Sequence, residues 1–296
     1  MISGKLYRTV SDRCWNTAKR LTDLQEMGLA LQVVSPMPEL LSYWMPSADA
    51  QQLLRFTNDQ IARMADESGG RIRGLGAVPL QDLELALREL EYVVSTLKFP
   101  GVEIGSNVNG VPVGDPALDS FFEACESLGA AVFVHALKPT GMDRVVGPAP
   151  LQQVLAYPTE VGLAAASAIT GKLMLRRPRL RIAFSHGGGT LAALLPRLQQ
   201  GWTAFPALAD AIEVAPAEQV RRMYYDTLVF DEATLRHLVT TFGADRLMLG
   251  TDYPFNFHER APVDRVAAAG FDAAVTAQLV HRNAEAFLDI GAEVAA

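Results

Sequence analysis

The sequence has few cysteines, no long apolar run and no excess of basic residues. Its 296 residues contain two cysteines, Cys14 and Cys125, which form no C-x-x-C pair. We therefore expect reduced thiols in a cytoplasmic protein. No apolar stretch approaches the roughly 18 residues of a membrane helix, and the N-terminal MISGKLYRTV lacks the apolar core of a secretory signal. The formal net charge of -7 argues against nucleic acid or an anionic membrane as the main partner.

Histidine is also scarce, with five in the chain and none before His135. No H-x-H or H-E-x-x-H pattern is present, so any metal site would have to be assembled from residues far apart in the sequence. No G-x-G-x-x-G follows the first strand-like segment, which disfavours the alternative of a doubly wound open sheet that binds a dinucleotide.

What the sequence does contain is an alternation of strand-like and helical segments. Short apolar runs rich in β-branched and aromatic residues are separated by helical patterns such as DLELALRELEYVVSTL, with leucines three and four residues apart. This alternation predicts a parallel sheet buried on both faces. We expect one domain over 1–296, a (β/α)₈ barrel in which one strand-helix unit is missing at the N-terminus. The strand-like segments are 30–36, 72–80, 101–106, 130–136, 180–188, 223–229 and 246–255.

Polar residues stand at the ends of three of these segments: His135, His186 and Asp252. Barrels of this kind place their chemistry at the carboxyl ends of the strands. His135 and Asp252 are candidate metal ligands, and His186 is a candidate general base. The three glycines after His186 would permit close approach of backbone and substrate, and their amides could hold a carboxylate. The alternative is that each polar residue only caps its strand.

Four other residues are weaker candidates. Asp226 ends or lines a strand, and we leave open whether it is structural or faces the barrel mouth. His258 follows the last strand and could overhang the site. His237 and His281 lie in helical patterns, where a structural or solvated position is expected.

The segments LSYW, GLGAVPLQDLELA, GVEIG, VFVHA, FSHGGG, YYDTLVFD and LGTDYPF occur in an order and spacing that resembles the aminocarboxymuconate-semialdehyde decarboxylase family of the metal-dependent amidohydrolase superfamily. The resemblance covers the chain from about Gly4 onward. It implies a distorted (β/α)₈ TIM barrel, one divalent metal, usually zinc, and a homodimer.

The resemblance also implies roles for individual residues. His135 and Asp252 correspond to metal ligands, and His186 corresponds to the catalytic acid/base. Arg197, in LLPRLQQGW, corresponds to an arginine that binds a substrate carboxylate across the dimer interface, and Arg8, in GKLYRTV, to a second carboxylate-binding arginine.

Two features depart from the family pattern. The family's first strand carries D-x-H-x-H, which supplies two metal ligands and has no counterpart in this sequence. Either the chain starts late relative to its natural protein, or it is a shortened homologue that has lost its metal. Ala136-Leu137 stands where the decarboxylases have Pro-Trp, so the pocket wall differs.

We therefore expect non-oxidative decarboxylation of an unsaturated or aromatic carboxylic acid, a small-molecule substrate. Two alternatives remain open at this point. One is metal-dependent hydrolysis or hydration, which needs the same metal, water and base. The other is a metal-free, non-catalytic barrel, for example as a subunit beside a full-length homologue.

Overall fold

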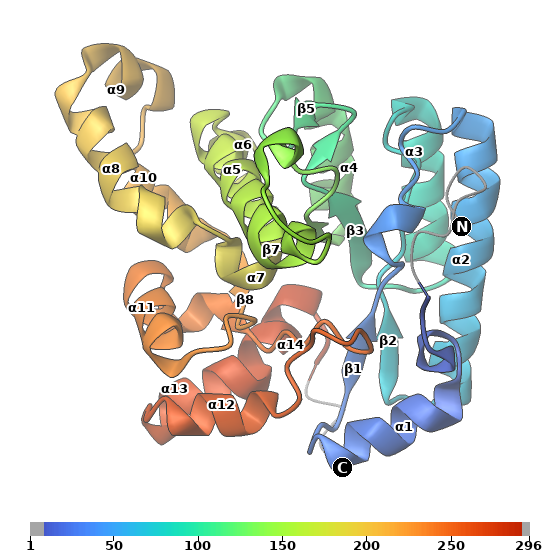
Figure 1. Cartoon of the computed structure of the whole chain (residues 1–296). Coiled ribbons are helices and arrows are strands. Elements are labelled where there is room, and N and C mark those ends of the chain that lie inside the picture. Colours follow the sequence, from blue (N-terminus) through green and yellow to red (C-terminus); the bar gives the residue numbers. More distant parts are fainter. Residues whose placement is uncertain (1–8, 292–296) are drawn as a thin grey trace.

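The computed structural model describes residues 9–291, and its framework is a row of parallel strands surrounded by helices (Figure 1). The strands pair in the orders β1-β2 and β3-β6-β7-β8-β9, and every neighbouring pair is parallel. A parallel bridge between Gly76 and Val102 joins the two groups. The amide of Gly76 donates to the carbonyl of Gly101 at 3.0 Å, which continues the same wall. The fold is the predicted distorted (β/α)₈-type barrel, with seven wall strands among the described residues.

Each strand of the wall lies within one of the seven segments that the sequence predicts. The predicted segment 246–255 is longer than its strand because the chain leaves the ladder after Met248 and turns into the loop that carries Asp252. The strands are β1 (Gln32–Val34), β2 (Ile72–Gly74), β3 (Gly101–Gly105), β6 (Ala131–His135), β7 (Ile182–Phe184), β8 (Tyr224–Asp226) and β9 (Leu247–Met248). A separate hairpin, β4 (Asn107–Val108) and β5 (Val111–Pro112), follows β3.

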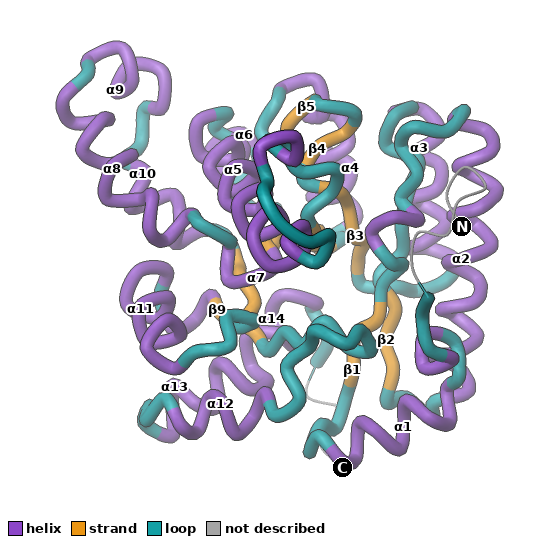
Figure 2. Tube along the Cα trace, viewed as in Figure 1, coloured by secondary structure: helices purple, strands orange, loops and turns teal. Residues whose placement is uncertain are grey.

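Helices cover the outside of the wall, and α8, α9 and α10 project from it as an arm (Figures 1 and 2). None of the described helices is long and apolar enough to span a bilayer. The longer helices are α1 (Thr17–Glu26), α2 (Ser47–Glu67), α3 (Leu83–Glu91), α4 (Asp119–Leu128), α5 (Tyr157–Thr170), α8 (Leu191–Ala204) and α11 (Glu232–Phe242). The shorter ones are α6 (Leu173–Arg176), α7 (Ser185–Gly188), α9 (Pro206–Ile212), α10 (Pro216–Gln219), α12 (Pro262–Ala268), α13 (Ala273–Ala277) and α14 (Asn283–Leu288).

Side chains alternate between two cores along each strand, as the two-residue period of a strand requires. One set faces the helices and includes Val132 and Val134 of β6. The other set fills the barrel interior, where Ala131 and Phe133 of the same strand pack with residues of β7, β8 and β9. Phe287 of α14 packs into this interior cluster. The interior below the carboxyl ends is therefore filled, which leaves the upper rim for the site.

The wall is open along one side. Strands β1 and β9 stand at the two ends of the row, and no ladder joins them within the described part of the chain. This opening agrees with the predicted shortage of one N-terminal strand.

Candidate metal centre and active-site pocket

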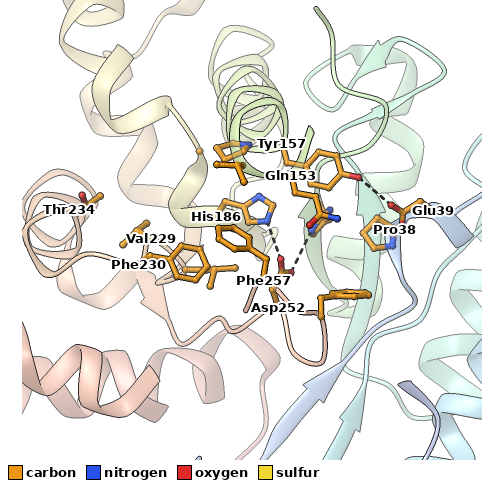
Figure 3. A pocket seen from close by; sticks show the side chains of 16 residues that line it. Pro38, Glu39, Gln153, Tyr157, His186, Val229, Phe230, Thr234, Asp252 and Phe257 are labelled. Atoms are coloured by element: carbon orange, nitrogen blue, oxygen red, sulfur yellow. Dashed lines mark hydrogen bonds and ion pairs between the residues drawn. The ribbon is translucent and has the colours of Figure 1, made fainter. Parts of the chain in front are cut away.

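The structure brings His135, His186 and Asp252 together at the rim. His135 is the last residue of β6, His186 follows β7, and Asp252 lies in the loop after β9. One potential ligand atom from each lies within 4.8 Å of the other two. Nε2 of His135 is 4.0 Å from Oδ1 of Asp252, and Nε2 of His186 is 3.9 Å from Oδ2 (Figure 3). The predicted convergence of these residues is therefore observed.

Asp226, the last residue of β8, holds the turn that carries His186. Its carboxylate accepts the backbone N–H of His186 at 2.9 Å, of Gly187 at 2.7 Å and of Leu228 at 3.0 Å. His186 and Gly187 both have left-handed backbones, with φ of 54° and 62°. Burial raises the pKa of Asp226 to about 6, against the opposing effect of these three donors. Asp226 is thus a positioning residue, and its side chain is directed at the turn.

The third glycine of the turn, Gly189, has no room for a side chain because the backbone of the turn lies close to the backbone of α5. A Cβ on Gly189 would lie 1.9 Å from the carbonyl oxygen of Pro158 and 2.6 Å from the amide of Gly162, both on α5. Two of the three glycine amides are used inside the turn: Gly187 donates to Asp226, and Gly189 donates to the carbonyl of His186 at 2.9 Å. The prediction that these two amides hold a carboxylate is wrong, because the tight turn uses them itself.

The two site histidines have different surroundings. Nδ1 of His135 lies 3.0 Å from the carbonyl of Ala136, which places the ring proton on Nδ1 and leaves the lone pair of Nε2 facing Asp252. Burial, with a smaller contribution from His135, lowers the pKa of His186 well below its ordinary 6.5. His186 is therefore a neutral imidazole near pH 7, and its protonated form is a stronger acid than an ordinary imidazolium.

Glu103, near the middle of β3, is a buried acid that the sequence analysis did not single out. Its side chain accepts a hydrogen bond from the hydroxyl of Ser35, and the residue is 2% exposed. Burial raises the pKa of Glu103 to about 7, while His135 acts in the opposite direction. The feature of the sequence that could have indicated Glu103 is a single carboxylate inside the otherwise apolar segment GVEIG.

The three residues open into a pocket of about 310 Å³. Tyr157 stands beside both imidazoles, with ring centroids 5.8 Å from His135 and 6.5 Å from His186, and its hydroxyl donates to Glu39 at 3.2 Å (Figure 3). Among the described residues no lysine or arginine lines it. The other lining residues are Pro38, Gln153, Val154, Pro158, Gly189, Leu228, Val229, Phe230, Thr234, Phe255 and Phe257.

Comparison with known proteins shows to which family the chain belongs. A family model described as amidohydrolase matches residues 11–290. The chain belongs to the amidohydrolase family. The resemblance that the motifs indicated is thereby confirmed.

Two relatives of this amidohydrolase are named as decarboxylases. It is 38% identical, over 88% of its own length and 73% of the relative's, to a 2-amino-3-carboxymuconate-6-semialdehyde decarboxylase of Dictyostelium discoideum. The crystal structure of 5-carboxyvanillate decarboxylase from Sphingomonas paucimobilis superposes with a TM-score of 0.84 at 27% identity, covering 93% of this chain and 83% of that one.

A third protein shares the fold. A dihydroxybenzoic acid decarboxylase from Polaromonas superposes with a TM-score of 0.81 at 24% identity, and the match covers 92% of this chain and 85% of the other. That protein was crystallised with manganese and the inhibitor 2-nitroresorcinol.

The two predicted substrate arginines are not seen at the amidohydrolase's own pocket. Arg197 is exposed on α8, in the projecting arm, and does not line the pocket. Arg8 lies outside the described residues. A role for Arg197 would therefore require a second copy of the chain.

The remaining histidines are peripheral. His237 is exposed on α11, and exposed His281 contacts Glu285 at 3.2 Å, as expected for structural or solvated positions. His258 packs edge-on against Tyr253, with ring centroids 5.8 Å apart, and does not line the pocket.

Proposed function

We propose that this amidohydrolase is a metal-dependent, non-oxidative decarboxylase of an unsaturated or aromatic carboxylic acid. The observation that carries the proposal is the gathering of two imidazoles and a carboxylate in a pocket whose other walls are largely apolar. The volume of about 310 Å³ is at the small end for ligand sites and suits a planar acid of about one ring. The decarboxylase names of the relatives from Dictyostelium and Sphingomonas support the same reaction.

The donor atoms fit a divalent metal. Nε2 of His135 and the carboxylate of Asp252 would hold it, because both present lone pairs to the same space. Zinc is the ion we expect, and manganese is the alternative, since the Polaromonas decarboxylase contains it. Bound there, the metal would lower the pKa of a water ligand and draw electron density from the substrate.

His186 would supply the proton that decarboxylation needs. The bond between the substrate carbon and its carboxylate breaks, CO₂ leaves, and the electron pair stays on the carbon. The neutral His186 ring first takes a proton from solvent, and the imidazolium then gives this proton to the carbon, which forms the new C–H bond and leaves the ring neutral again. Its lowered pKa makes this imidazolium a stronger acid than an ordinary one, which favours donation to carbon. Asp226 keeps the ring in place through the turn.

We further propose a homodimer of single-domain chains in the cytoplasm. The projecting arm exposes Leu194 (47%) and Phe205 (62%) close in sequence to Arg197, and apolar surface beside a cation is typical of a protein interface. Arg197 of one copy would bind the substrate carboxylate in the pocket of the other, together with Arg8.

The test is a pair of variants assayed for CO₂ release from a panel of aromatic and unsaturated acids. His186→Ala should lower kcat by about 100-fold to 10,000-fold while metal content holds. His237→Ala, on the surface of α11, should leave turnover unchanged. Equal turnover of His186→Ala and the unchanged protein would remove His186 from the mechanism. Opening of a lactone or ester without CO₂ release would replace decarboxylation by hydrolysis, and an absence of metal would favour a non-catalytic barrel.

A further inference from the structure

Gln153 lines the pocket with a carboxamide that has no partner in the protein. The residue lies in the π-helical turn Gln152–Ala156, which leads into α5, and Figure 3 shows its side chain reaching into the pocket. Its backbone N–H donates to the carbonyl of Pro150 at 3.0 Å, but within the described part of the chain its carboxamide makes no hydrogen bond. Because the residue is only half-buried, this amide is available to a molecule bound in the pocket.

The other polar side chains that line the pocket already have partners. Three of them form the candidate metal centre. The hydroxyl of Tyr157 donates to Glu39 at 3.2 Å. The hydroxyl of Thr234 donates to the carboxylate of Asp231 at 2.6 Å, at the start of α11. Among the described lining residues, Gln153 is therefore the polar side chain that remains for recognition of a substrate group outside the metal centre.

Two phenylalanines give the same pocket an aromatic wall. Phe230 comes from the loop after β8 and Phe257 from the loop after β9, and their ring centroids lie 4.7 Å apart. Both line the pocket and are partly exposed, so a planar ring could pack against them. Such packing holds a ring without distinguishing its substituents, and that distinction is left to the carboxamide of Gln153.

We propose that Gln153 is a specificity-determining residue, whose carboxamide binds an uncharged polar substituent on the ring of the acid. The inference rests on the proposed decarboxylase function and narrows its substrate class. A carboxamide both donates and accepts hydrogen bonds, so it matches a hydroxyl or an amide group. A second carboxylate beside Gln153 fits less well, because no lysine or arginine lines the pocket among the described residues and a desolvated charge needs a partner.

The experiment measures the binding of matched acids to the full chain in the presence of Zn²⁺, by isothermal titration calorimetry. The acids are benzoate, 3-hydroxybenzoate, 4-hydroxybenzoate and isophthalate, which differ only in the ring substituent. The unchanged protein should bind one of the hydroxybenzoates about threefold to tenfold more tightly than benzoate, which is the usual effect of one neutral hydrogen bond. Isophthalate should bind no more tightly than benzoate. Gln153→Met, which keeps the length of the side chain without the amide, should lose the preference and leave the affinity for benzoate unchanged.

Gln152→Met is the matched control, because Gln152 lies in the same turn and is not among the described lining residues. It should keep the preference of the unchanged protein. Gln153→Asn, which retains the amide on a shorter side chain, should show a smaller preference than the unchanged protein. Equal affinity of the unchanged protein for benzoate and both hydroxybenzoates would overturn the role of Gln153. A preference that survives in Gln153→Met, or tighter binding of isophthalate than of either hydroxybenzoate, would overturn it as well.

CO₂ release from the same acids separates this inference from the proposed function. Preferential binding that depends on Gln153, without CO₂ release from any of the four, would leave the role of Gln153 standing and overturn decarboxylation of these acids. Failure of all four acids to bind would overturn the role of Gln153, and the proposed decarboxylase would still be decided by the comparison of His186→Ala with the unchanged protein.

Discussion

Replacing Gly189 by alanine tests whether the turn that carries His186 depends on contact between two backbones. Gly189 has φ of 60° and ψ of -130°, a conformation that residues with a Cβ rarely adopt. That strain costs about 1–3 kcal/mol. The added Cβ would also lie 1.9 Å from the carbonyl oxygen of Pro158. Because the obstacle is backbone, relief requires the turn and α5 to separate, at a further cost of about 1–3 kcal/mol. We expect a total destabilisation of about 4 kcal/mol.

Gly129 provides the matched control. It also has a left-handed backbone, with φ of 66°, but no atom lies within 4 Å of a Cβ added there. Gly129→Ala should therefore cost only the backbone preference, about 1–2 kcal/mol. For 296 residues the unfolding entropy is about 0.6 kcal/mol/K, so we expect Tm to fall by about 6 °C for Gly189→Ala and by about 2 °C for Gly129→Ala.

Thermal unfolding followed by circular dichroism measures both variants, and turnover is measured beside it. Gly189→Ala should also lose activity, since Gly189 lines the pocket next to His186. Equal Tm values for the two variants would refute the argument, because they would show that the approach to Pro158 costs nothing.

Three further outcomes are expected. Asp226→Asn places an amide donor opposite the backbone N–H of His186. We therefore expect kcat to fall at least tenfold while metal affinity is unchanged, as steady-state kinetics and metal titration would show. Equal losses of kcat and of metal affinity would contradict a role confined to the turn. In the metal-free protein, folded Glu103 (pKa about 7 against its ordinary 4.5) retains a proton that the unfolded chain releases. The free energy of unfolding should therefore fall by at most about 3 kcal/mol as the pH rises from 4.5 to 7. Urea unfolding across this range should show a shallower fall for Glu103→Gln, and identical slopes would exclude Glu103 as the source. Gly201 lies inside α8, and a Cβ added there would have Leu208 as its nearest neighbour, at 3.4 Å. Gly201→Ala should therefore stabilise the fold by about 0.5–1 kcal/mol. A lower Tm would contradict this.

The sequence was sufficient to predict the wall and the three converging residues for a simple reason. Parallel strands connected by helices all direct their carboxyl ends to one rim, so His135, His186 and Asp252 had to meet once the seven strands were recognised. No contact between them needed to be known. Their order in the sequence and their place at strand ends carried the whole prediction.

The sequence was insufficient where side-chain direction or backbone geometry decides the role. Glu103 sits inside a strand, and only the register with Phe133 shows that it faces the interior. Asp226 could have faced the pocket, but the left-handed turn after β7 directs three backbone N–H groups at it. The same turn uses the amides of Gly187 and Gly189, which sequence alone left available for a ligand.

Because the barrel is open on one side, the imidazoles and the carboxylate of the site are supported in different ways. His135 and His186 follow β6 and β7, which lie inside the continuous ladder from β3 to β9. Asp252 follows β9, at the end of the row, so ladder hydrogen bonds support it from one side only. Its loop is held instead from across the opening, because the hydroxyl of the adjacent Tyr253 hydrogen-bonds to Asp23 of α1. The geometry of the metal centre thus depends on two kinds of support. Strand pairing supports the imidazoles, and contacts of Tyr253 with α1 support the loop of the carboxylate, through its hydroxyl to Asp23 and through its ring beneath the guanidinium of Arg20, 5.1 Å from the ring centroid.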